Sequence, residues 1–256
     1  MKGALLVLEH NAIVYRRTWR GSIFVSFVSP LLFLTAMGVG LGSLIARGPN
    51  HSVGGLPYLS FIAPGLLLVA TMQTAFSEMA YPILSKTQWL HTYDGMLATP
   101  IRVRDILAGE IGWLLIRLAT VASIFFAVMV AFGAVHSAQA AAAIPVAILN
   151  GLAFGAPMLA FSAAQRSDIG FAMIGRFIIT PLFILGGTFF PLQQLPGAVQ
   201  SFAWLTPLAH GVALARALTS GTATSDAMLQ HVAVLALYAA AGIVVARFTL
   251  QRRLAG

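Results

Sequence analysis

Residues 59–81 read LSFIAPGLLLVATMQTAFSEMAY, an apolar run whose only charged residue stands near its end. A helix rises about 1.5 Å per residue, so a run of this length crosses a hydrocarbon layer of about 30 Å. Similar runs lie at residues 22–46, 106–134, 138–163, 170–190 and 228–248. We therefore expect an all-α integral membrane protein, with six transmembrane helices in a single domain over residues 1–256.

The composition supports a membrane environment. Of the 256 residues, 59% are hydrophobic and 9% are charged, a balance typical of chains whose solvent is lipid. The formal net charge of +8 would suggest a nucleic-acid partner in a soluble protein. Here the basic residues stand at the ends of the apolar runs, so we expect membrane lipids as partners and no nucleic acid. The sequence has no cysteine, which excludes disulfides and thiolate metal sites.

The basic residues also predict the orientation. They gather before the first run, between the second and third, between the fourth and fifth, and after the sixth. The opposite loops hold only Arg47 and Arg216. Because loops rich in Lys and Arg stay in the cytoplasm, we expect a multi-pass protein of the cytoplasmic (inner) membrane with both termini cytoplasmic.

Residues 1–20 predict an amphipathic helix that lies in the membrane interface. Apolar residues recur there at spacings of three and four, and the basic residues Arg16, Arg17 and Arg20 fall mostly elsewhere around the helix. Tyr15 and Trp19 suit the headgroup layer. A flexible basic tail is the alternative interpretation.

Two connectors are too long for simple turns. Residues 82–105 predict a short cytoplasmic amphipathic helix, followed by a helix start at Thr99-Pro100; its apolar residues at helical spacing are Trp89, Tyr93, Met96 and Leu97. Residues 191–227 hold two short apolar pieces, 198–205 and 208–218, punctuated by prolines. We expect these external pieces, with Trp204 and His210, to re-enter the membrane or lie on it.

Ionisable residues within the apolar runs are candidates for function, because a charge at bilayer depth costs at least about 2.5 kcal/mol. Glu78 and Glu110 lie near predicted span ends, and Arg117 and Arg176 lie further inside. They could be polar points along a substrate route or a bracing network. Alternatively, their side chains reach the cytoplasmic headgroups. Glu110 and Arg117 share a helix face about 10 Å apart, too far for an assured direct bond.

The sequence offers no catalytic constellation. The phosphate-binding pattern G-x-x-x-x-G-K followed by Ser or Thr is absent, and so are H-E-x-x-H and G-x-S-x-G. The histidines are scattered without the spacing of metal ligands. We expect no catalytic residue, no metal and no bound cofactor; if ATP is used, it must bind elsewhere. The G-x-x-x-G pairs Gly38 with Gly42 and Gly151 with Gly155 predict close helix packing.

Two blocks of sequence carry a resemblance that covers essentially the whole chain. The first is TYDGMLATPIR at 92–102 with DILAGE at 105–110. The second is PLFILGGTFFPL at 181–192 with LP at 195–196, WLTPL at 204–208 and HG at 210–211. They resemble the type-2 ABC exporter permeases, especially the lipo-oligosaccharide branch of nodulation-factor (NodJ-like) permeases. Daunorubicin-type drug exporter permeases share the same plan.

This resemblance implies a non-catalytic transport subunit. Residues Trp89, Tyr93, Met96 and Leu97 would form a coupling helix that docks on a separate ATPase subunit, which binds ATP and Mg. A second permease copy or a paralogue would complete the route for an amphipathic substrate. The basic residues of the N-terminal helix would hold it at the headgroups, and Glu110 with Arg117 would guide a charged headgroup or brace the spans.

Two other classes of function remain as alternatives. An ion-gradient-driven secondary transporter would need acidic residues near the bilayer midplane and repeated halves. Glu78 and Glu110 lie close to the interface, and the two halves show no similarity. An intramembrane enzyme would need a nucleophile or metal motif, which the sequence lacks.

Overall fold

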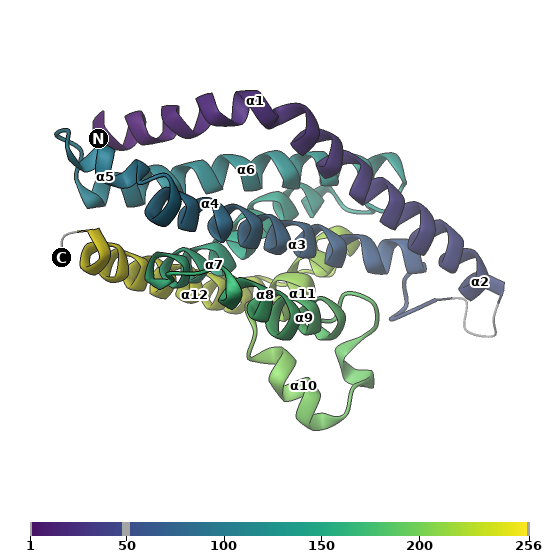
Figure 1. Cartoon of the computed structure of the whole chain (residues 1–256). Helices are drawn as coiled ribbons and strands as arrows, with labels where there is room; N and C mark the ends of the chain where they lie inside the picture. Colours follow the sequence, from purple (N-terminus) through teal and green to yellow (C-terminus); the bar gives the residue numbers. More distant parts are fainter. Residues whose placement is uncertain (1, 48–51, 255–256) are drawn as a thin grey trace.

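The computed structural model describes residues 2–47 and 52–254. Within these ranges the chain is almost wholly helical, and its only extended pairing is a bridge between Val53 and Leu56. Long helices lie side by side in a bundle, and the short helix α10 projects away from it (Figure 1). The expected all-helical architecture is confirmed for these ranges; Met1 and Gly256, the ends of the expected domain, lie outside them.

The first helical run is continuous over residues 2–47. It comprises α1 (Lys2–Phe33), the π-helical segment η1 (Leu34–Leu41) and α2 (Gly42–Arg47), and it bends part way along α1 (Figure 1). The sequence predicted an interface helix over 1–20 separate from a span over 22–46. No break divides them, because Gly21 at the expected junction is helical and no proline stands beside it.

Four long helices form the body of the bundle: α3 (Tyr58–Met79), α6 (Val103–Ala131), α7 (Ala143–Ala164) and α12 (Ser225–Leu254). In the most apolar 18-residue stretch of α3, 72% of the residues are buried within the chain, whereas in that of α12 the share is 22%. Helix α3 is therefore central and α12 peripheral. The exposed apolar side of α12 needs an apolar environment outside this chain, such as lipid.

Helix length and composition confirm part of the predicted span pattern. Within the described ranges, 4 helices are long and apolar enough to cross a membrane: Tyr58–Trp89, Val103–Ala131, Ala138–Ala164 and Ser225–Leu254. They correspond to the predicted spans at 59–81, 106–134, 138–163 and 228–248. The predicted spans at 22–46 and 170–190 correspond to the shorter apolar helices Leu31–Ile45 and Ile169–Leu185. By this measure the count of six is not confirmed.

The second of these shorter helices is irregular for a local reason. It consists of α8 (Ile169–Ile174), the π-helical η4 (Gly175–Ile179) and α9 (Thr180–Leu185). The Thr180 hydroxyl donates to the Gly175 carbonyl at 2.8 Å, five residues back. Pro181 follows without a backbone N–H. A helix that loses a donor in this way accommodates a wide turn.

Short helices fill the second long connector. After the 3₁₀ turn η5 (Leu192–Gln194) come α10 (Gly197–Trp204) and α11 (Pro207–Ser220). These lie within one or two residues of the apolar pieces expected at 198–205 and 208–218. Pro207 opens α11, where its missing N–H costs nothing.

Glycines allow the helices to approach closely. A Cβ at Gly151 or Gly155 would collide with Leu118 or Leu114 on α6, so this predicted G-x-x-x-G pair packs α7 against α6. A Cβ at Gly109 would lie 2.5 Å from Val7 Cβ, which shows how tightly α6 meets α1. Gly38 similarly accommodates Leu59.

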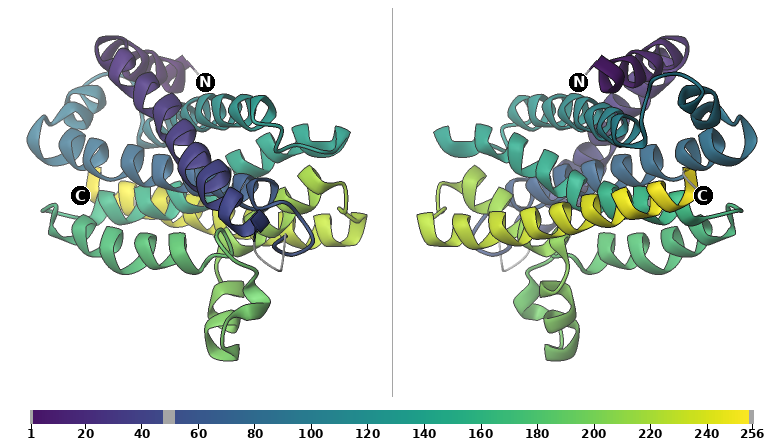
Figure 2. Two further views of the ribbon diagram at one scale, coloured as in Figure 1. Left: turned by 90° about the vertical axis from the view of Figure 1, so that its right-hand side faces the viewer. Right: turned by 90° about the vertical axis from the view of Figure 1, so that its left-hand side faces the viewer.

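The two ends of the bundle differ. The start of α1, the end of α12 and the connector helix α5 (Thr92–Leu97) lie together at one end, which we call the termini end (Figure 1). Helix α2 lies at the other, the distal end (Figure 1). In both turned views, α10 projects away from the bundle (Figure 2). That both termini share one side of the membrane stays a prediction.

Candidate functional site

The connector over residues 82–105 contains two short helical pieces with a sharp turn between them. After α4 (Tyr81–Leu84) the chain widens into the π-helical η2 (Ser85–Trp89), where the Leu90 N–H donates to the Ser85 carbonyl at 2.8 Å. His91 then adopts a left-handed φ of 49°, which costs about 1–2 kcal/mol in a residue with a side chain. The predicted continuous helix over Trp89 to Leu97 is therefore wrong, because His91 separates Trp89 from α5.

The predicted helix start at Thr99-Pro100 is also wrong. The Thr99 hydroxyl donates to the Met96 carbonyl at 2.6 Å and so closes α5. Helix α6 begins at Val103, where the Asp105 carboxylate accepts the Arg102 N–H at 3.1 Å. An acidic side chain at this position satisfies a donor that a helix start leaves free.

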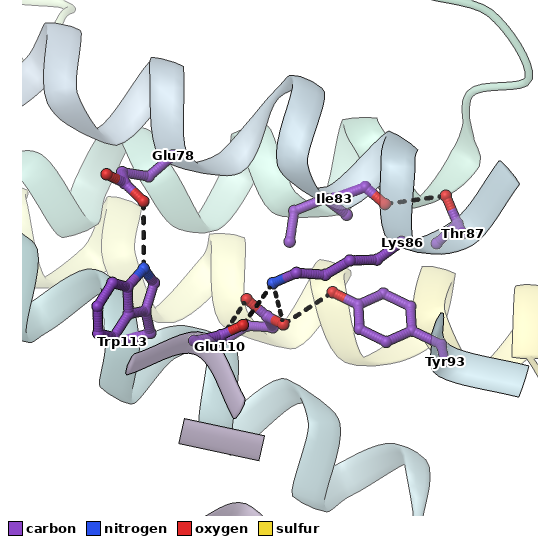
Figure 3. A network of polar contacts seen from close by, with 8 residues as sticks. Glu78, Ile83, Lys86, Thr87, Tyr93, Glu110 and Trp113 are labelled. Atoms are coloured by element: carbon purple, nitrogen blue, oxygen red, sulfur yellow. Dashed lines mark hydrogen bonds and ion pairs between the residues drawn. The ribbon is translucent and has the colours of Figure 1, made fainter. Parts of the chain in front are cut away.

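Glu110 on α6 is the centre of a buried polar cluster (Figure 3). Its side chain is 1% exposed, and its Oε1 lies 2.7 Å from Lys86 Nζ. The Tyr93 hydroxyl donates to the same oxygen at 3.0 Å, and Asn11 Nδ2 donates to Oε2 at 3.2 Å. Lys86 also donates to Asn11 Oδ1 at 2.8 Å. We call these four residues the connector cluster.

The connector cluster joins four helical elements, α1, η2, α5 and α6. Asn11 comes from α1, Lys86 from η2 and Tyr93 from α5, and all three meet Glu110 of α6. Burial, the charge of Glu110 and the hydrogen bond to it raise the pKa of the Tyr93 phenol well above its ordinary value. The phenol therefore stays protonated and donates to the carboxylate.

A second polar cluster lies further along α6. Arg117 Nε is 2.7 Å from Glu78 Oε1, and the Trp113 indole donates to Glu78 Oε2 at 3.2 Å. Figure 3 shows Trp113 below Glu78. Arg117 Nη1 donates to the Tyr15 hydroxyl at 2.6 Å, and the guanidinium lies 4.4 Å from the Tyr15 ring centroid. We call Tyr15, Glu78, Trp113 and Arg117 the brace cluster; it links α1, α3 and α6.

The two clusters explain what the charges on α6 do. Glu110 and Arg117 do not pair with each other, and each instead bonds to partners from other segments. Both are buried, at 1% and 5% exposure. They therefore bond inside the chain and do not extend to the surface. Arg176 is not part of either cluster: it is exposed on η4 and lines a surface hollow with Asp168.

The predicted ATPase-coupling residues differ in their exposure. Trp89 is 57% exposed at the end of η2, next to Leu90 at 70%. Met96 and Leu97 are partly buried against the core of the termini end. Tyr93 is fully buried and faces Glu110, so it cannot touch another protein in this conformation. On α1, Arg16, Arg17 and Arg20 are exposed.

A histidine cluster joins α10, α11 and α12. Trp204 and His210, both singled out from the sequence, are joined by His231 of α12. His210 Nδ1 lies 2.9 Å from His231 Nδ1, and His210 Nε2 lies 2.8 Å from the Trp204 carbonyl. The Trp204 and His231 rings stack with centroids 6.1 Å apart.

Sequence reasoning missed several partners. Asn11 and Tyr15 lie one helical turn apart on α1, each facing one polar cluster, but polar residues on an amphipathic helix are too common to single them out. Lys86 could have been singled out by its rarity, because the sequence has only one other lysine, Lys2. Nothing in the sequence singles out His231. In the part of the chain that the structure describes, no group of three or more His, Cys, Asp or Glu residues could hold a metal.

Comparison with known proteins gives concordant matches. The profile of the ABC-2 type transporter family matches residues 4–219. The chain is 30% identical over 250 residues to Nodulation protein J of Rhizobium leguminosarum bv. trifolii, covering 98% of this chain and 93% of that protein. It is 28% identical over 250 residues to Nodulation protein J of Rhizobium meliloti (strain 1021), covering 98% and 93%. It is 26% identical over 202 residues to the inner membrane transport permease YadH of Escherichia coli (strain K12), covering 77% and 74%.

Proposed function

The chain belongs to the ABC-2 type transporter family, and on that premise we propose that it is the permease subunit of an ATP-driven exporter. It moves an amphipathic substrate, of the class of a lipid-linked saccharide or a hydrophobic drug, across the cytoplasmic membrane by alternating access. A separate ATPase subunit binds ATP and Mg, and two permeases, identical or paralogous, form the route. Family membership favours this role over an ion-gradient-driven transporter and over an intramembrane enzyme.

The connector cluster is the observation that carries the proposal. Exposed Trp89 and Leu90 offer an apolar surface to an ATPase, and three residues before Trp89 the Lys86 ammonium reaches the buried Glu110. A displacement of η2 therefore acts on α6 through Glu110 and on α1 through Asn11. The segments bonded to the connector move with it.

The physical properties of the cluster suit it to transmit force. Its charged hydrogen bonds lie in a low-dielectric interior, where removing one partner of an ion pair costs about 3–5 kcal/mol. A push from the ATPase is then more easily relieved by moving whole helices than by breaking the cluster. The brace cluster adds α3 to the same unit, since Glu78 bonds to Arg117.

The orientation follows from the same reasoning. The ATPase lies in the cytoplasm, so the termini end, with Trp89 and both chain ends, faces the cytoplasm. Exposed Arg16, Arg17 and Arg20 hold α1 at anionic headgroups on that side. The distal end faces outward.

The test is co-purification with the ATPase encoded beside this chain, followed by ATPase and transport assays in lipid nanodiscs. Trp89→Asp places a charge in the apolar docking surface and should weaken the complex at least tenfold while leaving membrane insertion intact. Phe202→Asp is the matched control, since Phe202 is similarly exposed at 55% but lies on α10.

Two results would contradict the proposal. One is a stable, well-inserted chain that binds no ATPase. The other is an equal loss of binding in the Trp89→Asp and Phe202→Asp variants, which would show that the docking surface is not at the connector.

A further inference from the structure

A cavity of about 520 Å³ lies on the distal side of the molecule. Its wall includes the loop before α3 at Leu56, the segment after α9 at Gly187, and α11 at Arg216. Cavities of about 300–1,000 Å³ are the size at which proteins bind small molecules. None of the residues of the connector or brace clusters lines it.

Arg216 is the one charged residue in the described wall. Its Nε donates to the Phe61 carbonyl at 3.1 Å and its Nη2 to the Gly187 carbonyl at 2.7 Å. The guanidinium lies 3.7 Å from the Phe61 ring centroid. These contacts fix the group in position, and all of them are with neutral partners.

The positive charge of Arg216 is therefore not compensated by an acidic residue. Among the described residues no carboxylate forms an ion pair with it, and its Nη1 has no hydrogen-bond acceptor. Neutral residues that carry hydrogen-bond donors share the wall, namely Gln193, Trp204, Ser220 and Thr222. A fixed guanidinium with neutral donors and without a carboxylate is the arrangement that recognises oxyanions.

We propose that this cavity binds an oxyanion of the phosphate class. The anion supplies the counter-charge that Arg216 lacks, and the low-dielectric protein around the guanidinium strengthens the attraction. The phosphate could belong to a lipid headgroup or be free in solution, and both are recognised by the same chemistry. The proposal goes beyond the transport function, because binding here depends neither on ATPase docking nor on the connector cluster.

The experiment has one arm for each source of phosphate and uses the full chain. In detergent, calorimetric titration with inorganic phosphate measures binding of the free anion. In nanodiscs of phosphatidylcholine with a minor fraction of phosphatidylglycerol, native mass spectrometry measures retention of the anionic lipid. Arg216→Gln removes the charge, and Arg47→Gln removes the other basic residue of the predicted external loops as a matched control.

A second variant keeps the test decisive if Arg216→Gln does not fold. Ala213 lines the cavity three residues before Arg216 on α11, so Ala213→Glu brings a carboxylate beside the guanidinium without removing it. This variant should compete with the ligand as an internal counter-ion.

The proposal is supported if phosphate or phosphatidylglycerol binds saturably, if both cavity variants weaken that binding about tenfold or more, and if Arg47→Gln retains it. The arm in which binding is seen identifies the source of the phosphate. No saturable binding in either arm overturns it. Equal binding by wild type and a folded cavity variant overturns it too, as does an equal loss in Arg47→Gln.

Discussion

At the scale of single residues, the polar contacts of this chain concentrate on a few buried charges. Glu110 at 1% exposure accepts bonds from Lys86, Tyr93 and Asn11, which together satisfy both carboxylate oxygens. A buried carboxylate is tolerated only with such compensation. The cluster therefore contributes specificity of arrangement, while the surrounding apolar contacts supply most of the stability.

Breaking the buried ion pair should cost stability unequally. Lys86→Met leaves Glu110 unpaired at 1% exposure and should destabilise by about 3 kcal/mol or more. Glu110→Gln should cost less, because Lys86 is 15% exposed and can reach water. Thermal unfolding in detergent, followed by tryptophan fluorescence, measures both.

The double variant Lys86→Met with Glu110→Gln separates stability from coupling. It has no unpaired charge and keeps an acceptor for Tyr93, so most of the lost stability should return. ATP-dependent transport should remain impaired, because the connector no longer holds α6 by an ionic bond. Full recovery of transport would show that the cluster has only a structural role.

Arg117 should not be replaceable by lysine. Its Nε and Nη1 bond to two residues on different helices, Glu78 and Tyr15, and an ammonium group cannot reproduce that fork. Arg117→Lys should lower stability by about 1–2 kcal/mol, and Arg117→Ala by more. A lysine variant with wild-type unfolding temperature would contradict the bracing role.

The sequence identified the charges but not their partners. Glu110 and Arg117 stood out because ionisable residues are rare in apolar runs. The bond between Asn11 and Glu110 spans 99 residues, and that between Arg117 and Tyr15 spans 102. Pairings over such distances depend on how the helices pack, which one sequence without its relatives does not specify.

At the scale of elements, long apolar helices were predictable and short connectors were not. Four of the predicted spans correspond to long apolar helices, because a long hydrophobic run has few alternatives to a helix. The breaks at His91 and Thr99 depend on single hydrogen bonds and on one backbone angle. The spacing of hydrophobic residues does not reveal either break.

The contact between α1 and α6 gives a prediction at this scale. A Cβ at Gly109 would lie 2.5 Å from Val7 Cβ and 3.0 Å from the Ala4 carbonyl oxygen, so Gly109→Ala should cost about 1–3 kcal/mol by forcing the helices apart. Gly95 has nothing within 4 Å of its added Cβ. Gly95→Ala is therefore the matched control and should leave the unfolding temperature unchanged or slightly raised. Equal behaviour of the two variants would contradict the close packing.

At the scale of the whole molecule, the chain ends and the connector share one end of the bundle (Figure 1). The basic loops predicted that both termini share one side of the membrane, but loop charge does not place the short helices that surround the distal cavity. Those depend on prolines and glycines whose packing partners lie elsewhere in the chain.

The orientation can be checked directly, because the chain has no cysteine. Thr99→Cys and Ser225→Cys introduce single exposed thiols in different connectors. With the termini end in the cytoplasm, a membrane-impermeant maleimide should label position 225 in intact cells and position 99 only after the membrane is opened. The reverse pattern would invert the proposed topology.

The wide turn of η2 has a consequence for how the connector can move. A π turn holds about one residue more than an α turn. If that surplus residue passed into the neighbouring helix, the side chains beyond it would rotate by about 100° and advance by about 1.5 Å. Lys86 would then change its register against Glu110 while the backbone stayed helical. A chain that lacks Gln88 would be held in one register, and it should still bind the ATPase but no longer transport.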